Sequence, residues 1–574
     1  MADMNITINN QTFSATQGQT IGEVAWRNGI KIPALCFHPD LKIKANCRIC
    51  VVEIKGRVGL FTACSTLVED GMEILTESEA IAEARLTNLE LLFAQHQEEC
   101  DDCVISHNCT LLKLARDYKI NINQYPDRKK DFPVHKFGGA IEFNASKCID
   151  CGNCTEVCHN QGVDFLETKK GADNLPVVGP TKDKTKDCIY CGQCVAHCPV
   201  GAIEAVGEFE EVEEPIKNPA QTVVVQFAPA VRTAIGEAFD LPYTLDLEGK
   251  LVAGLRKLGV NFVFDVNVGA DFTTFEEAEE CVECVKEGGD KLPVLTSCCP
   301  SWVKYIEFNY PQFAGHLATT RSPHIILGGL IKTYWAQKQK IDPQKITVIS
   351  IMPCTAKKYE IRRPELAIDG LKPVDNVLTT RELAHLFRKN NIDLANLAPE
   401  KCDDPFGEYS GAAVIYGASG GVMESALRTA YFKMTGTELP GVDFKAVRGM
   451  EGIKKAQVDL PDGKKVKIVV VSGNGNAKKI MDELVKDPHA YDYVEVMSCP
   501  GGCIGGGGQP LPTNAHIRQQ RAQMLYQLDK THKNRLAHQN PIIKEMYGGF
   551  LKDEALRRKI MQTKFGRKNR EWEG

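Results

Sequence analysis

The chain has 574 residues and a formal net charge of −5, and 43% of its residues are hydrophobic and 25% charged. These values are typical of a soluble globular protein with several domains, because a single core rarely exceeds about 300 residues. The charge argues against nucleic acid as the main partner, and no apolar run of about 18 residues predicts a membrane span. Since the first residues lack the features of a signal peptide, we expect a cytoplasmic protein. There, 23 cysteines favour metal centres over disulfides.

Residues 1–80 contain short alternating runs, a helical stretch that starts at Thr20, and four cysteines spaced C-x10-C-x2-C-x13-C. These are Cys36, Cys47, Cys50 and Cys64. The pattern resembles the plant-type ferredoxin, a β-grasp fold that holds a 2Fe–2S cluster, although the first gap is longer than the usual four residues. It is closer to the variant found at the front of multi-cluster oxidoreductases. Zinc is the alternative occupant.

Residues 81–125 are predicted to begin with one amphipathic helix that runs as far as Cys100. His96 and Cys100 would then share one face of this helix, four residues apart. With Cys103 and Cys109 they form the motif H-x3-C-x2-C-x5-C. From spacing alone, one histidine and three cysteines suit either zinc or a 4Fe–4S cluster. The segment that follows favours the cluster.

Residues 126–210 hold two copies of the run C-x2-C-x2-C-x3-C, 40 residues apart. The second copy ends in Cys198-Pro199 and matches the bacterial two-cluster ferredoxin in full, whereas the first has His159 in place of the proline. In that fold the fourth cysteine of each run binds the other cluster. The resemblance therefore implies two 4Fe–4S clusters, one held by Cys148, Cys151, Cys154 and Cys198, the other by Cys188, Cys191, Cys194 and Cys158.

Residues 211–513 are predicted to form an α/β domain. A charged stretch at residues 208–218 is interpreted as a linker, and a strand over residues 222–228 leads through Pro229 into a helix. Strands and helices then alternate, which is typical of a mostly parallel sheet covered by helices. Residues 514–574 are helical and basic, and we expect them to wrap around this domain. The fold class is therefore multidomain, α+β in the cluster domains and α/β in the large domain.

Three strand-like runs of the α/β domain each end in cysteine. They lead into Cys298-Cys299-Pro300, Met352-Pro353-Cys354 and Cys499-Pro-Gly-Gly-Cys503. Because open α/β sheets bind ligands beyond the carboxyl ends of their strands, we expect four thiolates to converge: Cys299, Cys354, Cys499 and Cys503. Such a set suits zinc or a 4Fe–4S cluster. Glycines at positions 501, 502 and 505–508 would let the backbone pass close to it.

The chain has no G-x-G-x-x-G fingerprint that follows a strand and opens a helix. Without such a nicotinamide site, the electrons that a row of one-electron clusters brings to the four-thiolate pocket are most simply combined with protons there. The three cysteine motifs, with Lys357 after Cys354 and the glycines after Cys503, resemble the signatures of the iron-only (FeFe) hydrogenases. The resemblance covers nearly the whole chain and is strongest for the large clostridial, ferredoxin-linked members.

This resemblance implies an H-cluster, a 4Fe–4S cube joined through one cysteine sulfur to a di-iron unit. That unit carries carbon monoxide, cyanide and an azadithiolate bridge, and maturation proteins insert it. By motif, Cys299, Cys354, Cys499 and Cys503 would hold the cube, with Cys503 as the bridge. Cys298 would be the last protonic group, reached through Glu277 and Glu280, and Lys357 would hydrogen-bond a cyanide. The pocket wall would include Ala228, Pro229, Met352, Pro353, Tyr416 and Met497.

Several positions depart from the family's pattern. Ala318 stands where the proton path usually has serine, Cys284 where it has arginine, Ala230 where a serine is common, and Tyr416 where phenylalanine is usual. Only Cys298, Glu277 and Glu280 are therefore assigned to the path. Cys281 and Cys284 form an additional C-x2-C, interpreted as incidental, and Cys402 has no assigned role.

The sequence thus predicts a hydrogenase that catalyses 2H⁺ + 2e⁻ ⇌ H₂, with electrons from ferredoxin passing through one 2Fe–2S and three 4Fe–4S accessory clusters. Alternatives are the hydrogen-active subunit of a bifurcating or formate-linked complex, a hydrogen sensor, and an iron–sulfur assembly factor of the same family. Cys298, Lys357 and Met352 argue against the assembly factor. The row of clusters favours turnover over sensing.

Overall fold

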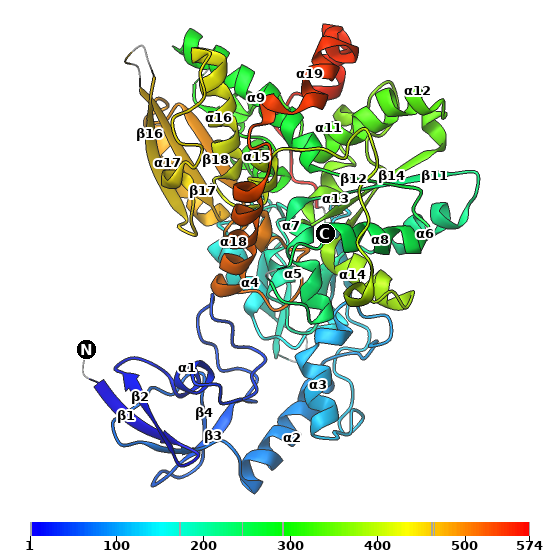
Figure 1. Ribbon diagram of the computed structural model, residues 1–574. Helices are drawn as coiled ribbons and strands as arrows, with labels where there is room; N and C mark the ends of the chain where they lie inside the picture. Colours follow the sequence, from blue (N-terminus) through cyan, green and yellow to red (C-terminus); the bar gives the residue numbers. More distant parts are fainter. Residues whose placement is uncertain are drawn as a thin grey trace.

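The computed structural model describes residues 3–171, 174–243, 245–289, 292–460, 463 and 465–572. The N-terminal domain, in blue, lies apart at one end of the molecule, and the cluster-rich segment in lighter blue and cyan connects it to the large C-terminal part (Figure 1). No helix in the described ranges is long and apolar enough to cross a membrane.

The N-terminal domain is a five-stranded sheet with strand order β2-β1-β5-β3-β4 and one helix packed on it. The helix begins with a capping box, in which Thr20 accepts from the Glu23 amide and Glu23 accepts from the Thr20 amide. The predicted strands and helix are therefore present. Their bounds are β1 Asp3–Ile8, β2 Gln11–Thr16, α1 Ile21–Arg27, β3 Val51–Ile54, β4 Leu60–Thr62 and β5 Glu73–Leu75.

The helix predicted for residues 81–100 is shorter than expected. α2 (Glu79–Phe93) ends before His96, because its last turn tightens into hydrogen bonds between residues three apart. The prediction that His96 and Cys100 share a helical face is therefore wrong. His96 is instead held by Lys147, whose carbonyl oxygen lies 2.7 Å from its Nδ1. The segment continues with η1 Ser106–Asn108 and α3 Thr110–Asp117.

The two cysteine runs fold alike, so the sequence repeat is also a structural one. In each run a glycine with positive φ, Gly152 (+75°) or Gly192 (+67°), directly precedes a short helix. A three-stranded sheet of order β10-β7-β6 and the hairpin β8-β9 complete this region. The bounds are β6 Val134–Phe137, β7 Ile141–Asn144, α4 Asn153–Asn160, β8 Leu166–Lys170, β9 Pro176–Pro180, α5 Gln193–Ala196 and β10 Ile203–Ala205.

The stretch interpreted as a linker, residues 208–218, is instead a helix, α6 (Phe209–Lys217). Val212 is buried in the core of the large domain, and Phe209 and Ile216 pack against that core. These three residues are spaced by three and four, which is the helical pattern that the surrounding glutamates obscure. Pro215 lies in the last turn, where it breaks few hydrogen bonds.

The large domain contains two four-stranded sheets. The first, of order β12-β11-β14-β15, is parallel throughout, and the second, of order β13-β18-β17-β16, is parallel except for β16. The predicted α/β arrangement is therefore present, but the cysteine-bearing strands divide between two sheets. Their bounds are β11 Thr222–Phe227, β12 Phe262–Asp265, β13 Val294–Leu295, β14 Ile346–Met352, β15 Asn376–Thr379, β16 Ile453–Asp459, β17 Lys465–Ser472 and β18 Tyr493–Met497.

Helices surround both sheets, and the long helix α9 packs against α11 and α16 between them (Figure 1). The helix predicted after Pro229 is a single turn, α7. The bounds are α7 Pro229–Arg232, α8 Glu248–Leu258, α9 Asn267–Glu287, α10 Pro300–Asn309, α11 Pro323–Leu330, α12 Ala336–Gln339, α13 Ala356–Glu360, α14 Thr380–Lys389, α15 Gly411–Val414, α16 Gly421–Thr435 and α17 Asn474–Lys486.

The C-terminal segment is helical, as predicted, and its end returns to the two-cluster region. Glu571 accepts hydrogen bonds from the hydroxyls of Tyr190 and Tyr359, and Trp572 packs edge-on against Phe165. These contacts tie the large domain to the two-cluster region. The helices are α18 Ala515–Thr531, α19 Pro541–Gly548 and α20 Glu554–Met561.

Candidate active site

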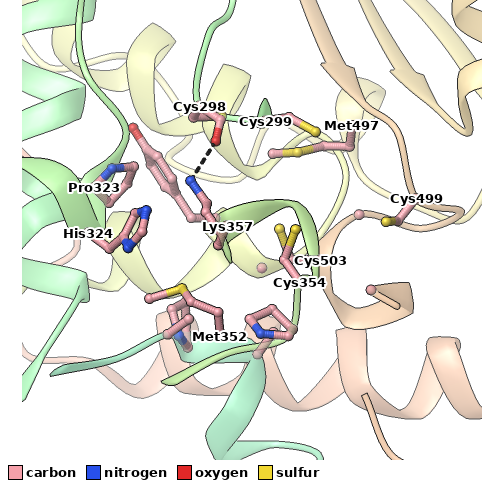
Figure 2. Close-up of a pocket in the computed structure, with 18 of the residues that line it drawn as sticks. Cys298, Cys299, Pro323, His324, Met352, Cys354, Lys357, Met497, Cys499 and Cys503 are labelled. Atoms are coloured by element: carbon pink, nitrogen blue, oxygen red, sulfur yellow. Dashed lines mark hydrogen bonds between the residues drawn. The ribbon is translucent and has the colours of Figure 1, made fainter. Parts of the chain in front are cut away.

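A cavity lies where the three cysteine loops meet. Cys354 follows β14 of the first sheet, whereas the other cysteine loops follow β13 and β18 of the second (Figure 2). The structure thus brings together residues that lie far apart in the sequence. Every residue predicted for the pocket lines this cavity: Ala228, Pro229, Cys298, Cys299, Met352, Pro353, Cys354, Lys357, Tyr416, Met497, Cys499 and Cys503.

The donor set fits an iron–sulfur group. Burial, followed by the neighbouring Cys299, raises the pKa of Cys354 to about 12. Burial, followed by Cys354 and Cys299, raises the pKa of Cys499 well above its ordinary value. Buried thiols this close cannot all ionise unless positive charge compensates them. Thiolate-bound iron supplies that charge, and iron–sulfur clusters take four such ligands.

Two of the predicted glycines, Gly502 and Gly506, border the cavity. A Cβ at Gly502, whose φ is +95°, would lie 2.6 Å from the Ser419 amide nitrogen, and one at Gly506 would overlap the Pro353 carbonyl. A Cβ at Gly507 would overlap Gly192 of the two-cluster region. The glycine run is therefore needed for close approach of backbone to backbone, as well as for access to the cavity.

Lys357 brings a buried positive charge to the cavity. Its Nζ donates to Glu360 Oε2 at 2.7 Å and to the Cys298 carbonyl oxygen at 3.1 Å, the second of which Figure 2 marks. Burial lowers the pKa of the amine, but the charge and hydrogen bond of Glu360, together with the charges of Cys354 and Cys298, outweigh burial, so the pKa of Lys357 is raised. An ammonium has three N–H donors, so a third N–H is available to an anionic ligand.

His324, which no sequence motif singles out, completes this arrangement. Its Nε2 lies 2.6 Å from Glu360 Oε2, and its Nδ1 lies 3.1 Å from Ser350 Oγ. Burial, followed by the charge of Lys357, lowers the pKa of His324 to about 4, so the ring is neutral near pH 7. A neutral ring that donates from Nε2 to the carboxylate accepts the Ser350 hydroxyl at Nδ1. The chain Ser350–His324–Glu360 therefore fixes the position of Lys357.

The remaining wall is apolar. Cys298, Tyr416 and Met497 belong to one buried cluster beside the cavity. The hydroxyl of Tyr416, which distinguishes it from the expected phenylalanine, lies 2.8 Å from Thr274 Oγ1. Because this hydroxyl has a protein partner, the tyrosine adds no unpaired polar group to the wall.

Glu277 and Glu280 do not line the cavity but lie on α9. Glu277 is 1% exposed, so it does not belong to a solvated helix face, the ordinary place for a glutamate on a helix. Burial raises its pKa to about 8, and its Oε1 accepts a 2.7 Å hydrogen bond from the Tyr493 hydroxyl. After burial, the charge of Glu277 is the largest influence that raises the pKa of Cys298. The charge of Glu277 therefore acts on the Cys298 thiol.

Glu280 is the outer carboxyl group of the predicted proton path. Ala318 is buried in an apolar cluster with Cys281 and Tyr493, and it contributes no hydroxyl. Both carboxylate oxygens of Glu280 accept from the Thr319 amide, at 2.9 and 3.0 Å. The hydroxyls of Thr319 and Thr320 reach Glu280 Oε2 at 3.2 and 3.4 Å. Threonine hydroxyls therefore occupy the neighbourhood of this carboxylate.

The accessory thiols extend from the N-terminal domain to the cavity. After burial, Cys198 raises the pKa of Cys151 most, and Cys47 of the N-terminal domain also contributes. Burial, Cys158, Cys354 and Cys299 likewise raise the pKa of Cys191. The fourth cysteine of each run thus approaches the other run.

The two-cluster region touches the cavity directly. Cys499 Sγ lies 3.8 Å from the Cys191 carbonyl oxygen, and Gln193 Nε2 donates to the Gly505 carbonyl at 2.9 Å. This fold and site define a class of redox protein in which a row of iron–sulfur sites leads to a buried thiolate pocket with carboxyl groups behind it.

Comparison with known families agrees with this class. Residues 221–507 match the family described as "Iron only hydrogenase large subunit, C-terminal domain". Residues 2–79 match a 2Fe-2S iron-sulfur cluster binding domain, residues 147–202 a 4Fe-4S dicluster domain, and residues 515–566 the iron hydrogenase small subunit. Segment 81–125, with His96, lies mostly between these matches, so its cluster stays a prediction.

The chain is 41% identical over 565 residues to the NADP-reducing hydrogenase subunit HndD of Solidesulfovibrio fructosivorans, covering 96% of each chain. It is 37% identical over 556 residues to Iron hydrogenase 1 of Clostridium pasteurianum, covering 95% of this chain and 96% of that one. Its structure resembles [FeFe]-hydrogenase HydA1 from Chlamydomonas reinhardtii with a TM-score of 0.56 and 35% identity, covering 62% of this chain and 98% of the other.

The chain therefore belongs to the iron-only (FeFe) hydrogenase family. It is an FeFe hydrogenase with accessory iron–sulfur domains, and it catalyses the oxidation of H₂ and the reduction of protons. The predicted family, 2Fe–2S domain, dicluster domain and hydrogenase domain are confirmed.

Proposed function

We propose that the cavity holds an H-cluster, whose cube is bound by Cys299, Cys354, Cys499 and Cys503, with Cys503 as the bridge to the di-iron unit. The observation that carries this proposal is that all four thiols line one cavity. When bound, this group supplies the electrons and the metal site for proton reduction. The surrounding residues exclude water and cover the diatomic ligands: Ala228, Pro229, Met352, Pro353, Tyr416 and Met497.

A test of this assignment is a matured Cys354→Ala variant studied by infrared spectroscopy. We expect the bands of iron-bound carbonyl and cyanide to disappear while the spectra of the accessory clusters persist. Cys402→Ala is the matched control, since Cys402 is also half-buried but lies outside the cavity. Normal bands in the Cys354→Ala protein would overturn the assignment.

We propose that Cys298 is the last protonic group and that Glu277 and Glu280 relay protons to it. Cys298 lines the cavity, the charge of Glu277 acts on it, and Glu280 is only partly buried on the next turn of α9. A general acid must reach its partner before its pKa matters, and this order of burial runs from the cavity toward the surface. Lys357 holds a fixed charge for a cyanide ligand instead of passing protons.

We propose that electrons pass from a 2Fe–2S cluster on Cys36, Cys47, Cys50 and Cys64 through the 4Fe–4S clusters. One 4Fe–4S cluster would lie on His96, Cys100, Cys103 and Cys109, and two would use the crossed cysteine runs. In support of this route, the charge of Cys47 acts on Cys151 and that of Cys354 acts on Cys191. Iron analysis and electron paramagnetic resonance of a His96→Ala variant would test the cluster count. Loss of one 4Fe–4S signal is expected, whereas an unchanged spectrum would exclude His96 as a ligand.

We propose ferredoxin as the electron partner of the isolated chain. A second candidate is the hydrogenase subunit of a larger complex, which is favoured by the 41% identity to a subunit of an NADP-reducing hydrogenase. Hydrogen-dependent reduction of ferredoxin by the pure chain, without reduction of NADP⁺, is the expected result. Co-purification of stoichiometric flavin-containing subunits, with NADP⁺ reduction that requires them, would favour the complex.

We also propose a cytoplasmic location. Most of its cysteines are assigned as ligands of iron–sulfur clusters, and a reducing compartment keeps thiols available for this role. Maturation proteins that deliver the di-iron unit would then act in the same compartment. Fractionation of the native host that places hydrogenase activity in the periplasm would contradict this proposal.

A further inference from the structure

Behind the cavity, one tyrosine holds Glu277, the carboxyl group whose charge acts on Cys298. We propose that Tyr493 is a positioning residue for the proton relay, because its hydroxyl fixes the orientation of the Glu277 carboxyl group. This inference rests on the relay proposed above. The observation that carries it is the 2.7 Å hydrogen bond from Tyr493 Oη to Glu277 Oε1, between two side chains that are each 1% exposed.

Tyr493 lies on the face of β18 where every second side chain contacts the cavity or a helix beside it. Side chains two apart on a strand point to the same face, so Tyr493, Glu495 and Met497 share one face of β18. Met497 lines the cavity. Glu495 accepts hydrogen bonds from the amides of Gly420 and Met423, at 2.6 Å each, at the start of α16. The same face therefore reaches the cavity, α16 and, through Tyr493, α9.

The strand that carries the Tyr493 phenol pairs with a neighbouring strand on each side. Tyr493 pairs with Val294 of β13 and with Ile468 of β17, both in parallel register. Glu277 lies in the middle of α9, which spans Asn267–Glu287. A hydrogen bond between two buried elements of this kind fixes the carboxyl group much more firmly than a bond to a mobile loop, because neither side chain has room to rotate.

The other hydroxyls nearby serve different partners. Those of Thr319 and Thr320 reach Glu280, and that of Tyr416 lies 2.8 Å from Thr274. Ala318 contributes none. Among the residues that the structure describes, Tyr493 thus supplies the side-chain hydroxyl that meets Glu277. The position that lacks a hydroxyl and the tyrosine that supplies one belong to the same buried cluster.

The charged groups around Glu277 show how the Tyr493–Glu277 hydrogen bond affects the pKa of Glu277. Burial raises the pKa of Glu277 to about 8, the Tyr493 hydrogen bond lowers it, and the charges of Glu280 and Glu495 raise it. Burial followed by Glu277 raises the pKa of Tyr493 well above its ordinary value, so the phenol stays protonated and donates. The ionisable groups that face Glu277 are Tyr493, Glu495, Glu280, Cys281, Tyr416 and Cys298.

Removing the hydroxyl should therefore make Glu277 hold its proton more tightly. A hydrogen bond to a charged group shifts the pKa of that group by roughly one unit or more. We expect Tyr493→Phe to move the midpoint of the pH profile of H₂ oxidation upward by about one unit. The carboxyl C=O stretch of protonated Glu277 should also move to higher wavenumber in infrared difference spectra, because the carbonyl loses a donor.

The matched control is Tyr491→Phe. Two residues away on the same chain segment, Tyr491 donates to Glu483 Oε2 at 2.5 Å, so this variant removes the same kind of bond far from the relay. Its pH profile and carboxyl band should equal those of the wild type. Unchanged cyanide bands and accessory-cluster spectra in both variants would show that the fold and clusters are intact.

Three outcomes decide between the claims. If Glu277→Gln loses turnover and Tyr493→Phe moves both the pH midpoint and the carboxyl band, the inference holds. If Glu277→Gln loses turnover but Tyr493→Phe moves neither, Tyr493 does not position Glu277 and the inference is wrong. If Glu277→Gln turns over normally, the relay itself is wrong, and the inference falls with it. An Ala318→Ser exchange in the Tyr493→Phe protein would further show whether a hydroxyl from the neighbouring position restores the midpoint.

Discussion

The two sheets of the large domain bring different chemistry to one cavity. The parallel sheet delivers Cys354 and, on α13, Lys357 with its partner Glu360. The mixed sheet delivers Cys298 and Cys299 after β13, and its strand β18 holds Glu277 of α9 through Tyr493. Both halves bury carboxyl groups. They differ in the sign of the neighbouring charge.

That difference decides what each half can do. Glu360 is buried beside Lys357 and His324, and although burial alone would raise its pKa, Lys357 lowers it to about 2. Glu277 is buried beside Glu280 and Glu495, and its pKa rises to about 8. The first carboxyl group is therefore always ionised and fixes a charge, whereas the second gains and loses a proton near neutral pH. One half orients an anionic ligand, and the other can pass protons.

The largest expected effect lies in the proton-passing half. Cys298→Ala should lower hydrogen evolution by about 10²–10⁴-fold, the range of a lost general acid. Iron-bound carbonyl and cyanide bands should remain, because Cys298 is not assigned as a ligand. Hydrogen evolution from reduced methyl viologen measures the loss, and Cys402→Ala, outside the cavity, should evolve hydrogen normally. Near-normal evolution by Cys298→Ala would exclude it as the last proton donor.

A somewhat smaller loss is expected one step outward. Glu277→Gln keeps the shape of the side chain but removes its ionisable proton, and turnover should fall by about 100-fold. Glu279→Gln is the matched control, because Glu279 lies on the same helix but pairs with Lys433 near the surface. Equal rates for the two variants in a hydrogen-evolution assay would remove Glu277 from the path.

In the charge-fixing half the expected effect is on stability. Glu360→Gln leaves the buried ammonium of Lys357 without its counter-charge, which should cost about 3–5 kcal/mol. The thermal unfolding midpoint should fall, and the cyanide bands should shift as Lys357 changes position. Glu365→Gln is the control, because Arg363 still keeps Glu307 at 2.8 Å. A Glu360→Gln protein as stable as the control would show that the ion pair does not support this half.

The smallest effect is a pH dependence. Because the pKa of Glu277 is raised to about 8, it holds a proton at pH 7 and releases it as the pH rises. H₂ oxidation needs the ionised form as proton acceptor, so its rate should increase through pH 8, whereas hydrogen evolution should decrease over the same range. Initial rates in both directions between pH 6 and 10 measure this, with unfolding monitored separately. A profile with no inflection near pH 8 would show that the ionisation of Glu277 does not control the rate of turnover.

Much of the site could be read from the sequence because its ligands sit in local patterns. Most of the accessory cysteines have two or three residues between one and the next, and each loop of the cavity carries its own cysteine motif. Glu277 was also found by motif, although nothing in the sequence showed that it is buried. Spacing reveals ligands that one turn or loop brings together.

The parts that the sequence did not reveal are contacts between distant elements. His324 lies in the first turn of α11 and Glu360 is the last residue of α13. Tyr493 of β18 meets Glu277 of α9. Such pairs depend on how helices pack on sheets, which no local pattern encodes. The sequence does not predict the helix α6 for a different reason. Its many glutamates are typical of a charged linker, although three apolar residues lie at helical spacing among them. The shorter α2 was missed because its final turn closes early.

The central claim is that the two halves meet at one hydrogen-producing centre, and one measurement tests it most directly. Protein matured and purified without oxygen should show infrared bands of iron-bound carbonyl and cyanide. The same sample should evolve hydrogen from dithionite-reduced methyl viologen. Carbonyl and cyanide bands without hydrogen evolution would indicate a defect in the proton path. Matured protein that shows neither bands nor hydrogen would contradict the account.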